Sequence, residues 1–484
     1  MKNLLLALLP ICLFPSVLKS QNPALSPVKK EMSQKIDARF AEYKDIAAKI
    51  WDYAETGFKE EKSTAVLQKR LREAGFKVET GVAEMPTAFV ASFGSGKPVI
   101  GILAEFDALP GITQTDSPER TPDPKKDAGH ACGHHLFGVA STAAGISLKE
   151  MLENEKISGT VRVYGTPAEE GGNGKAYMVR AGLFDDVDVV LHWHPGNSNV
   201  ANAASSLANV SIKFRFHGIS AHAAGAPEQG RSALDGVESM NYMVNMLREH
   251  VTQETRIHYI ITKGGRAPNV VPDFSEVHYL IRHPKRHEVK NLVDRVVKAA
   301  EGAALGTGTT MDYEIMGGAF ELLPVEILSK LVHRNLESVG GVEYTAAEVA
   351  FAEKIQKTLI GETPPDIASA KTVKPFEVEA LRKGSGSTDV GDVSWVVPTV
   401  GFRTATWVPG TPAHSWQAVA CGGTDIGFKG MMVAAKTLAL SGYDLFHDAK
   451  TIQLAREEWE KLLGKDFKYE ALFGDRKPPL DYRD

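Results

Sequence analysis

Buried-strand and helix patterns alternate along residues 97–196, and this alternation limits the fold more than any other feature of the sequence. The run KPVIGILAEFDALPG at 97–111 is continuously apolar and ends in a turn, which is typical of a buried strand. A small-residue helix is expected at 136–156, and a strand that runs into a Gly-rich loop is expected at 159–172. A helical segment at 175–184 then leads to a strand within 187–196. This order predicts an α/β fold with a parallel sheet, in which ligands bind at the carboxyl ends of the strands.

The pattern changes from about Leu207, where alternating residues predict a strand at 209–218. An amphipathic helix, a second strand, a second helix and a further strand are expected to complete a compact α+β unit inserted in the first domain. A polar, Pro-containing span from about Thr363 to Lys383 is expected to be a flexible excursion. The predicted domain ranges are 30–206 and 321–450 for the two parts of the catalytic domain, 207–320 for the inserted unit and 451–484 for a C-terminal tail.

The N-terminal residues predict a secretory signal at 1–20. Lys2 precedes an apolar run that is broken by Pro10 and Pro15 and is too short to span a bilayer comfortably. Cleavage after Ser20 would give a secreted or periplasmic protein. Lipidation at Cys12 is a weaker alternative, because no small residue stands just before it.

Charge and cysteine content narrow the possible partners. The formal net charge of −5 provides no basic surface for nucleic acid, so we expect a small-molecule or peptide substrate. Removal of the signal leaves Cys132 and Cys421. In an oxidising compartment they could form a disulfide. Alternatively, Cys132 is a metal-bound thiolate and Cys421 is a small buried apolar side chain.

Potential metal ligands are concentrated in several loops. In DAGHACGHHLFG, Cys132 and His134 stand two residues apart in a Gly-containing turn, so both side chains could face one point. His130 and His135 are expected to orient this loop or to support the metal ligands. Glu169 and Glu170 are adjacent at a strand end, so one carboxylate could bind a metal while the other faces the substrate. The alternative for this pair is a solvated acidic loop.

Three further histidines are candidates: His192 and His194 lie on one face of a predicted strand, and His414 lies in a turn. His194 is nearer the carboxyl end of its strand than His192, which could equally be a hydrogen-bonded core residue. His414 lies in the turn PAHSWQ, where it could instead cap a backbone carbonyl. Together with Cys132 and Glu170, these residues offer thiolate, imidazole and carboxylate donors that suit zinc or manganese.

The motifs GHACGHHLFG, PAEEGGNGK, LHWHPG, GISAHAA and AHSWQ, in this order, resemble those of the amidohydrolases of the aminoacylase, carboxypeptidase and indoleacetyl-amino-acid hydrolase superfamily. GRSALDGVESM, APNVVPDFSEVHYLIRHP and STDVGDVSWVVP resemble the aminobenzoyl-glutamate hydrolases more closely. The resemblance covers about Ile36 to Leu445. It implies a zinc-peptidase-like catalytic domain interrupted by a ferredoxin-like lid that also dimerises.

The resemblance also implies a two-metal centre with Glu169 as the general base. The implied ligands are Cys132, His134, Glu170, His194 and His414. Cys132 would stand where relatives have a bridging carboxylate. Many relatives have a His-x-Asp ligand motif where this chain has Glu105-Phe106-Asp107, so Glu105 and Asp107 are expected to support the ligands. His135 is a second departure, because relatives often have Asp or Asn there.

Three residues of the inserted unit acquire roles from the same resemblance. His222 matches a lid histidine that reaches the active site across a dimer and stabilises an oxyanion. Asn269 and Arg282 are candidates to bind a substrate carboxylate, and Arg282 offers a bidentate fork. The alternatives are a surface role for His222 and a structural pairing of Arg282 with an acidic neighbour.

The expected activity is metal-dependent hydrolysis of the amide bond in N-acyl or N-aroyl amino acids, with release of the free amino acid. A homodimer or an assembly with a second related subunit is expected. The alternatives are a dipeptidase or carboxypeptidase of the same fold, and a non-catalytic partner subunit of a heteromeric hydrolase.

Overall fold

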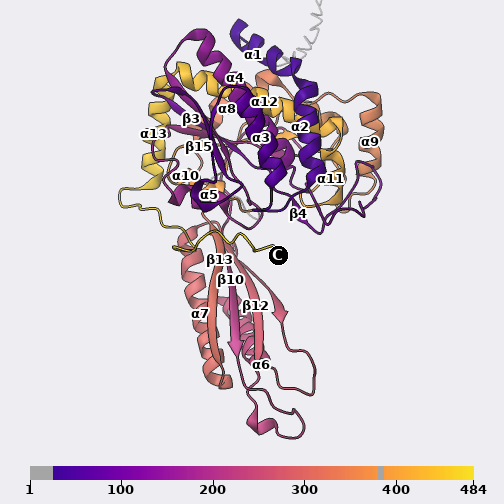
Figure 1. The fold of residues 1–484 in the computed structure, drawn as a ribbon, viewed down its shortest axis with the longest axis vertical. Coiled ribbons are helices and arrows are strands. Elements are labelled where there is room, and N and C mark those ends of the chain that lie inside the picture. The colour runs from indigo at the N-terminus through magenta and orange to yellow at the C-terminus, as the bar shows by residue number, and fades with distance from the viewer. Residues whose placement is uncertain (1–24, 380–385, 484) are drawn as a thin grey trace, which may run out of the picture.

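The computed structural model describes residues 25–379 and 386–483, which form a large α/β body from which a smaller unit projects (Figure 1). The predicted signal at 1–20 lies outside the described residues. Among the described residues, no helix combines the length and apolarity needed to cross a bilayer.

A six-stranded sheet forms the centre of the body, in the order β1-β2-β6-β3-β7-β15. The strands are β1 (Lys77–Thr80), β2 (Phe89–Ser95), β3 (Val99–Ala104), β6 (Gly159–Gly165), β7 (Val189–Leu191) and β15 (Thr399–Val400). Strands β6, β3, β7 and β15 are parallel, whereas β2 is antiparallel to both β1 and β6. All six residues of β3 are buried, which explains its continuous apolar sequence. The expected α/β fold is confirmed, with the difference that one side of the sheet is antiparallel.

Two long helices, α4 (His134–Glu155) and α12 (Asp425–His447), pack against each other and are buried over most of their length. Small residues permit this close packing: a Cβ at Gly442 would lie 2.4 Å from Cδ1 of Leu148. The other helices of the body are α1 (Pro27–Ala38), α2 (Phe40–Tyr53), α3 (Glu61–Glu73), α5 (Gly174–Arg180), α8 (Glu326–Val339), α9 (Ala346–Gln356), α10 (Val390–Ser394), α11 (Trp416–Gly422) and α13 (Ala449–Leu463).

Short strands complete the body near the carboxyl edge of the main sheet. They are β4 (Leu109–Pro110), β5 (Ala128–Gly129), β8 (His194–Gly196), β9 (Ala203–Ala204), β14 (Val378–Glu379) and β16 (Arg403–Ala405). The pairing of β14 with β9 contradicts the expected flexible excursion at 363–383 as far as the described part of that span is concerned. The Asn199 side chain also donates to the carbonyls of Ala370 and Thr372, which fixes this segment against the body.

The projecting unit, called the lid below, is a four-stranded antiparallel sheet in the order β11-β12-β10-β13, with two helices packed on it (Figure 1). Its elements are β10 (Ala208–His217), α6 (Ala233–Leu247), β11 (Arg256–Lys263), β12 (Phe274–His283), α7 (Arg286–Thr307) and β13 (Thr310–Ala319). This order is the expected ferredoxin-like arrangement. The strand count predicted from residue patterns was wrong, because β11 was missed. It is an edge strand with both Ile260 and Ile261 exposed, so it lacks one-sided apolar alternation.

Candidate metal centre

The carboxyl ends of β3, β6 and β7, together with the loops before α4 and α11, converge on one cavity of about 790 Å³. Residues of both the body and the lid line it. Eight of the residues named from the sequence are among the lining residues: Glu105, Cys132, Glu169, Glu170, His192, His194, Arg282 and His414. The parallel strands explain this convergence, because their carboxyl ends meet at the same edge of the sheet.

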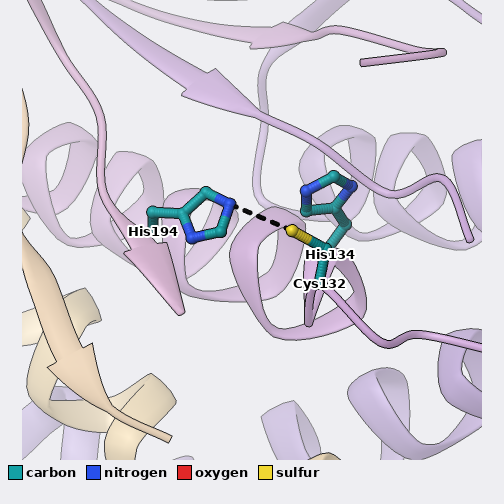
Figure 2. A group of neighbouring side chains, drawn as sticks. All are labelled: Cys132, His134 and His194. Carbon is teal, nitrogen blue, oxygen red and sulfur yellow. Dashed lines mark hydrogen bonds between the residues drawn. The ribbon is translucent and has the colours of Figure 1, made fainter. Parts of the chain in front are cut away.

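Cys132, His134 and His194 form a first group of possible metal ligands (Figure 2). Their donor atoms lie within 4.8 Å of one another, and the Cys132 Sγ is 3.4 Å from the His194 Nε2. Gly133 separates the first two residues at a φ of +78°, immediately before α4 begins. A Cβ at Gly133 would lie 2.7 Å from Cβ of Pro195, so this turn requires glycine on both counts.

Cys132 also belongs to a second group, with Glu170 and His414. The His414 Nε2 lies 3.3 Å from the Glu170 Oε1. His414 adopts a left-handed φ of +57°, and its backbone N–H donates to the Ala131 carbonyl at 3.0 Å. Such a backbone conformation is costly for histidine and persists only where surrounding contacts impose it. Because Cys132 belongs to both groups, its Sγ is a possible ligand that the two groups share.

His134 is held by two carboxylates from the end of β3. Its Nδ1 lies 2.9 Å from the Asp107 Oδ1, and its Nε2 lies 3.1 Å from the Glu105 Oε2. When Nδ1 carries the proton and donates a hydrogen bond to Asp107, the Nε2 lone pair is available for a metal. Glu105, His134 and Glu169 form a third possible ligand group, so Glu105 lies closer to the candidate ligands than a purely supporting role requires.

The buried carboxylates and thiol of this cluster require compensating positive charge. Burial raises the pKa of the Cys132 thiol, and the Glu170 carboxylate raises it further. Burial, together with Glu170 and Glu105, raises the pKa of Glu169 well above its ordinary value. The Glu170 Oε1 and His134 Nε2 are buried and lie at ion-pair distance from His414 and Glu105, but neither atom makes a hydrogen bond of good geometry to the described residues. Buried anionic donors of this kind are costly unless cations compensate them, so the donor set fits divalent metal ions.

Lys175, for which the sequence predicted no role, is completely buried beside the cluster. Its Nζ lies 2.7 Å from both the Glu105 Oε1 and the Asp389 Oδ1, and its backbone N–H donates to the Asp389 Oδ2. Both Lys175 and Asp389 fall within the recognised motifs PAEEGGNGK and STDVGDVSWVVP. A completely buried lysine needs carboxylate partners. The partners of Lys175 are distant in sequence, so they are recognised only in the folded structure.

The remaining histidines of the first loop contact backbone carbonyls. The His130 Nε2 lies 3.0 Å from the Ile50 carbonyl, and the His135 Nε2 lies 3.0 Å from the Gly422 carbonyl. These contacts suit the expected role in orienting the loop. Cys132 and Cys421 are both free, so the disulfide alternative is wrong in this structure. Cys421 is completely buried in a small apolar cluster.

The three lid residues lie at opposite ends of that unit. Arg282, near the end of β12, lines the cavity, and its Nε is buried without a hydrogen-bond partner. Burial lowers the pKa of this guanidinium, and no carboxylate of the described residues offsets the effect. His222 and Asn269 lie beyond the other end of β12: His222 bridges to Val270, and the Asn269 carbonyl accepts from the Ala223 N–H. Neither lines the cavity of its own chain.

Comparison with known proteins places the chain in a family. Residues 203–307 match the M20 peptidase dimerisation domain. The chain is 42% identical to a subunit of the p-aminobenzoyl-glutamate hydrolase of Escherichia coli, over 88% of its own length and 94% of that protein. It is 27% identical to the Xaa-Arg dipeptidase of Mus musculus, over 90% and 93% of the two chains.

A solved structure shows the same fold. A dinuclear metal-binding peptidase of the M20 family from Bacillus subtilis superposes with a TM-score of 0.54 at 16% identity, covering 85% of this chain and 99% of its own. The predicted superfamily and the expected amide hydrolase class are confirmed. The chain belongs to the M20 family of hydrolases and peptidases.

Proposed function

We propose that the chain hydrolyses the amide bond of N-acyl or N-aroyl amino acids, among them aminobenzoyl-glutamate, and releases the free amino acid. The observation that carries this proposal is the pair of three-donor groups that share Cys132, beside Glu169 and in the same cavity as Arg282. The 42% identity to a subunit of p-aminobenzoyl-glutamate hydrolase supports the substrate class.

The site would hold two divalent ions, zinc or manganese. Cys132, His134 and His194 would hold one, and Cys132, Glu170 and His414 the other. A metal pair, when bound, lowers the pKa of a water molecule from about 15.7 towards roughly 7 and polarises the substrate carbonyl. Asp107 would keep His134 in the ligand tautomer, because it accepts a hydrogen bond from the Nδ1–H group.

Glu169 acts as the general base. Glu169 and Glu105 line the cavity, and their carboxylates lie within 4.8 Å of the His134 imidazole. Glu169 is next in sequence to the candidate ligand Glu170. It takes a proton from the attacking water and delivers it to the nitrogen of the departing amino acid. The base and the ligand therefore come from one loop, so the position of that loop controls both functions.

Arg282 binds the substrate carboxylate through its guanidinium fork. A half-buried arginine that lines the cavity, and that forms no ion pair with a carboxylate of the described residues, is suited to an anionic ligand. An N-acyl amino acid with a free α-carboxylate satisfies this requirement. The interpretation of Arg282 as a structural strand residue with an acidic partner receives no support from its surroundings.

A second chain would supply His222 and Asn269. The His222 Nδ1 accepts hydrogen bonds from the N–H groups of Ala224 and Gly225, at 3.2 and 3.0 Å. The proton of a neutral His222 is therefore on Nε2, which can donate to an oxyanion. The exposed edge strand β11 offers a surface for pairing with another lid, since Ile260 is 63% exposed. The partner would be an identical chain or a second related subunit.

The predicted signal at 1–20 supports a secreted or periplasmic location. In that setting the enzyme would scavenge acyl-amino acids or peptides outside the cytoplasm. The intact donor set and Glu169 favour an active enzyme over a non-catalytic partner subunit.

The decisive experiment is a substrate panel run with added zinc and manganese in turn. The panel contains aminobenzoyl-glutamate, N-acyl amino acids and dipeptides, and metal content is measured on the same samples. We expect metal-dependent release of the amino acid from the acyl conjugates, and a loss of kcat of about 10²–10⁴-fold in Glu169→Gln. Full turnover in Glu169→Gln would show that another group is the base. Metal binding without turnover on any substrate would favour the partner-subunit alternative.

A further inference from the structure

The C-terminal segment 472–483 crosses the junction between the body and the lid (Figure 1). Phe473 is buried and stacks on Tyr177 of α5, with ring centroids 4.6 Å apart. The Arg180 guanidinium lies over both rings and donates to the carbonyls of Gly474 and Arg476, at 2.8 and 2.7 Å. The start of the segment is therefore attached to the body.

Arg476 attaches the same segment to the lid. Its Nη1 donates to the carbonyls of Ile315 and Met316, at 3.1 and 2.6 Å, and its Nη2 lies 2.8 Å from the Glu314 Oε1. These three residues belong to β13, the strand through which the chain returns from the lid to the body. The contacts span the two units close to the cavity.

The end of the segment reaches the loop that carries Glu169 and Glu170. The Tyr482 hydroxyl donates to the Glu170 carbonyl at 3.2 Å, and the Arg483 guanidinium donates to the same oxygen. On the other side, the Glu170 N–H donates to the Asp107 Oδ2 at 2.9 Å. Both backbone polar groups of a candidate ligand are therefore fixed, one of them by the C-terminal segment.

The body is shaped to receive Tyr482. Its ring packs edge-to-face on Phe58, with centroids 5.7 Å apart. A Cβ at Gly57 would lie 2.2 Å from the Tyr482 hydroxyl oxygen, so glycine is needed for the tyrosine to fit.

The Glu169–Glu170 loop needs such restraints because its backbone is strained. Ala168, just before Glu169, has a φ of +57°, and Asn173 has a φ of +56°. For residues other than glycine, each such conformation costs on the order of 1–3 kcal/mol and persists only when surrounding contacts impose it. The hydrogen bonds to the Glu170 carbonyl are among those contacts.

We propose that Tyr482 and Arg483 are positioning residues for the metal centre, which hold the Glu169–Glu170 loop in place through the Glu170 carbonyl. Arg476 links this restraint to the lid. The inference rests on the proposed function, because it assumes that Glu170 is a ligand and Glu169 the base. Under this proposal, the end of the predicted C-terminal tail is a part of the site.

The test compares the double variant Tyr482→Phe/Arg483→Gln, which removes both donors, with Arg483→Lys, which keeps a charged donor. Lys477→Gln is the matched control, since Lys477 lies in the same segment but, among the described residues, its side chain pairs with the exposed Glu84 and not with the Glu169–Glu170 loop. Zinc affinity is measured by competition with a chelator, the cobalt-substituted protein is examined by absorption spectroscopy, and kcat and KM are determined on an acyl-amino acid that the wild type cleaves.

We expect the double variant to lose about tenfold or more in zinc affinity, with an altered cobalt spectrum and a lower kcat at similar KM. Arg483→Lys should retain most of the affinity, and Lys477→Gln should match the wild type. A double variant with wild-type zinc affinity and spectrum would overturn the proposal, even if its thermal stability fell, because the contacts would then be merely structural. A wild-type protein that binds no zinc or cobalt would overturn the proposed metal centre and, with it, this inference.

Discussion

Lys175 stabilises the candidate metal centre through ion pairs with its buried carboxylates. It is a completely buried cation between two buried carboxylates, Glu105 and Asp389, and Glu105 in turn contacts His134. The chain of contacts therefore connects the N-terminal end of α5 to a candidate ligand. Removal of one partner from a buried ion pair leaves an uncompensated charge, which costs more than the pair contributes.

We therefore expect Lys175→Met to destabilise the protein by about 3–5 kcal/mol, measured by urea-induced unfolding. Lys49→Met, which breaks the exposed pair between Lys49 and Asp45, is the control and should leave the unfolding midpoint nearly unchanged. Equal effects of the two substitutions would show that the ion pairs of Lys175 do not stabilise the cluster.

Asp392 is a buried carboxylate away from the candidate ligands. It accepts hydrogen bonds from the Phe320 N–H and the Tyr469 hydroxyl, at 3.1 and 2.8 Å. Burial raises the pKa of Asp392 to about 7 from an ordinary value of 3.8. Because the folded-state pKa lies above the unfolded value, the stabilising contribution of the protonated form is complete below pH 3.8 and is lost as the pH rises through 7.

Asp392→Asn does not titrate, so its stability relative to the wild type should improve as the pH rises. We expect the difference in unfolding free energy to shift by roughly 2 kcal/mol in favour of the variant between about pH 5 and pH 8. Denaturant unfolding of both proteins across this range measures the shift. A difference that stays constant with pH would mean that Asp392 is ionised in the folded protein throughout the range.

At the level of secondary-structure elements, β11 is the strand of the lid that the residue pattern did not predict. Strands β3 and β10 were predicted, because continuous apolar burial and strict alternation are both visible in a short window. Strand β11 has a buried Ile257, but residues 260–263 are all exposed. An edge strand whose two faces are both exposed does not show the one-sided apolar pattern by which a strand is recognised in the sequence.

If β11 forms the dimer interface, Ile260→Glu should convert the dimer to a monomer, because it places a charge in the proposed apolar contact. Light scattering coupled to size-exclusion chromatography measures the mass. Leu305→Glu is the control, since Leu305 is 86% exposed on α7, away from β11, and the dimer should persist. A dimeric Ile260→Glu protein would place the interface elsewhere.

At the scale of the whole molecule, the lid holds His222 and Asn269 far from the cavity of their own chain. His222 and Asn269 lie at one end of β12, whereas Arg282 lies at the other end, in the cavity. A strand of ten residues spans about 33 Å, so one chain cannot bring all three residues to its own cavity in this conformation. A two-fold dimer could supply His222 from the second chain.

A heterodimer of differently tagged Glu169→Gln and His222→Ala chains tests this arrangement. If His222 acts across the dimer, one of the two sites keeps both residues, so the purified heterodimer should have about half the wild-type activity. If His222 acts within its own chain, both sites are defective and the heterodimer should be as inactive as the parent variants. Each variant homodimer serves as a control.

Local patterns in the sequence were enough to predict the α/β body, the inserted lid and the motifs that hold the candidate site residues. Periodic apolar residues and short motifs can be recognised without knowledge of the packing, because each lies within a short window. The candidate ligands were named from the sequence, where Cys132 and His414 are far apart, and their roles remain predictions.

Which of these residues contact one another is decided only by the tertiary structure. The fold places Cys132 in two donor groups at once, pairs Lys175 with Glu105 and Asp389, and brings Tyr482 to the Glu170 carbonyl. It also separates His222 from the cavity of its own chain. These are contacts between segments distant in sequence. They depend on how helices and strands pack, a property of the whole chain that no local pattern encodes.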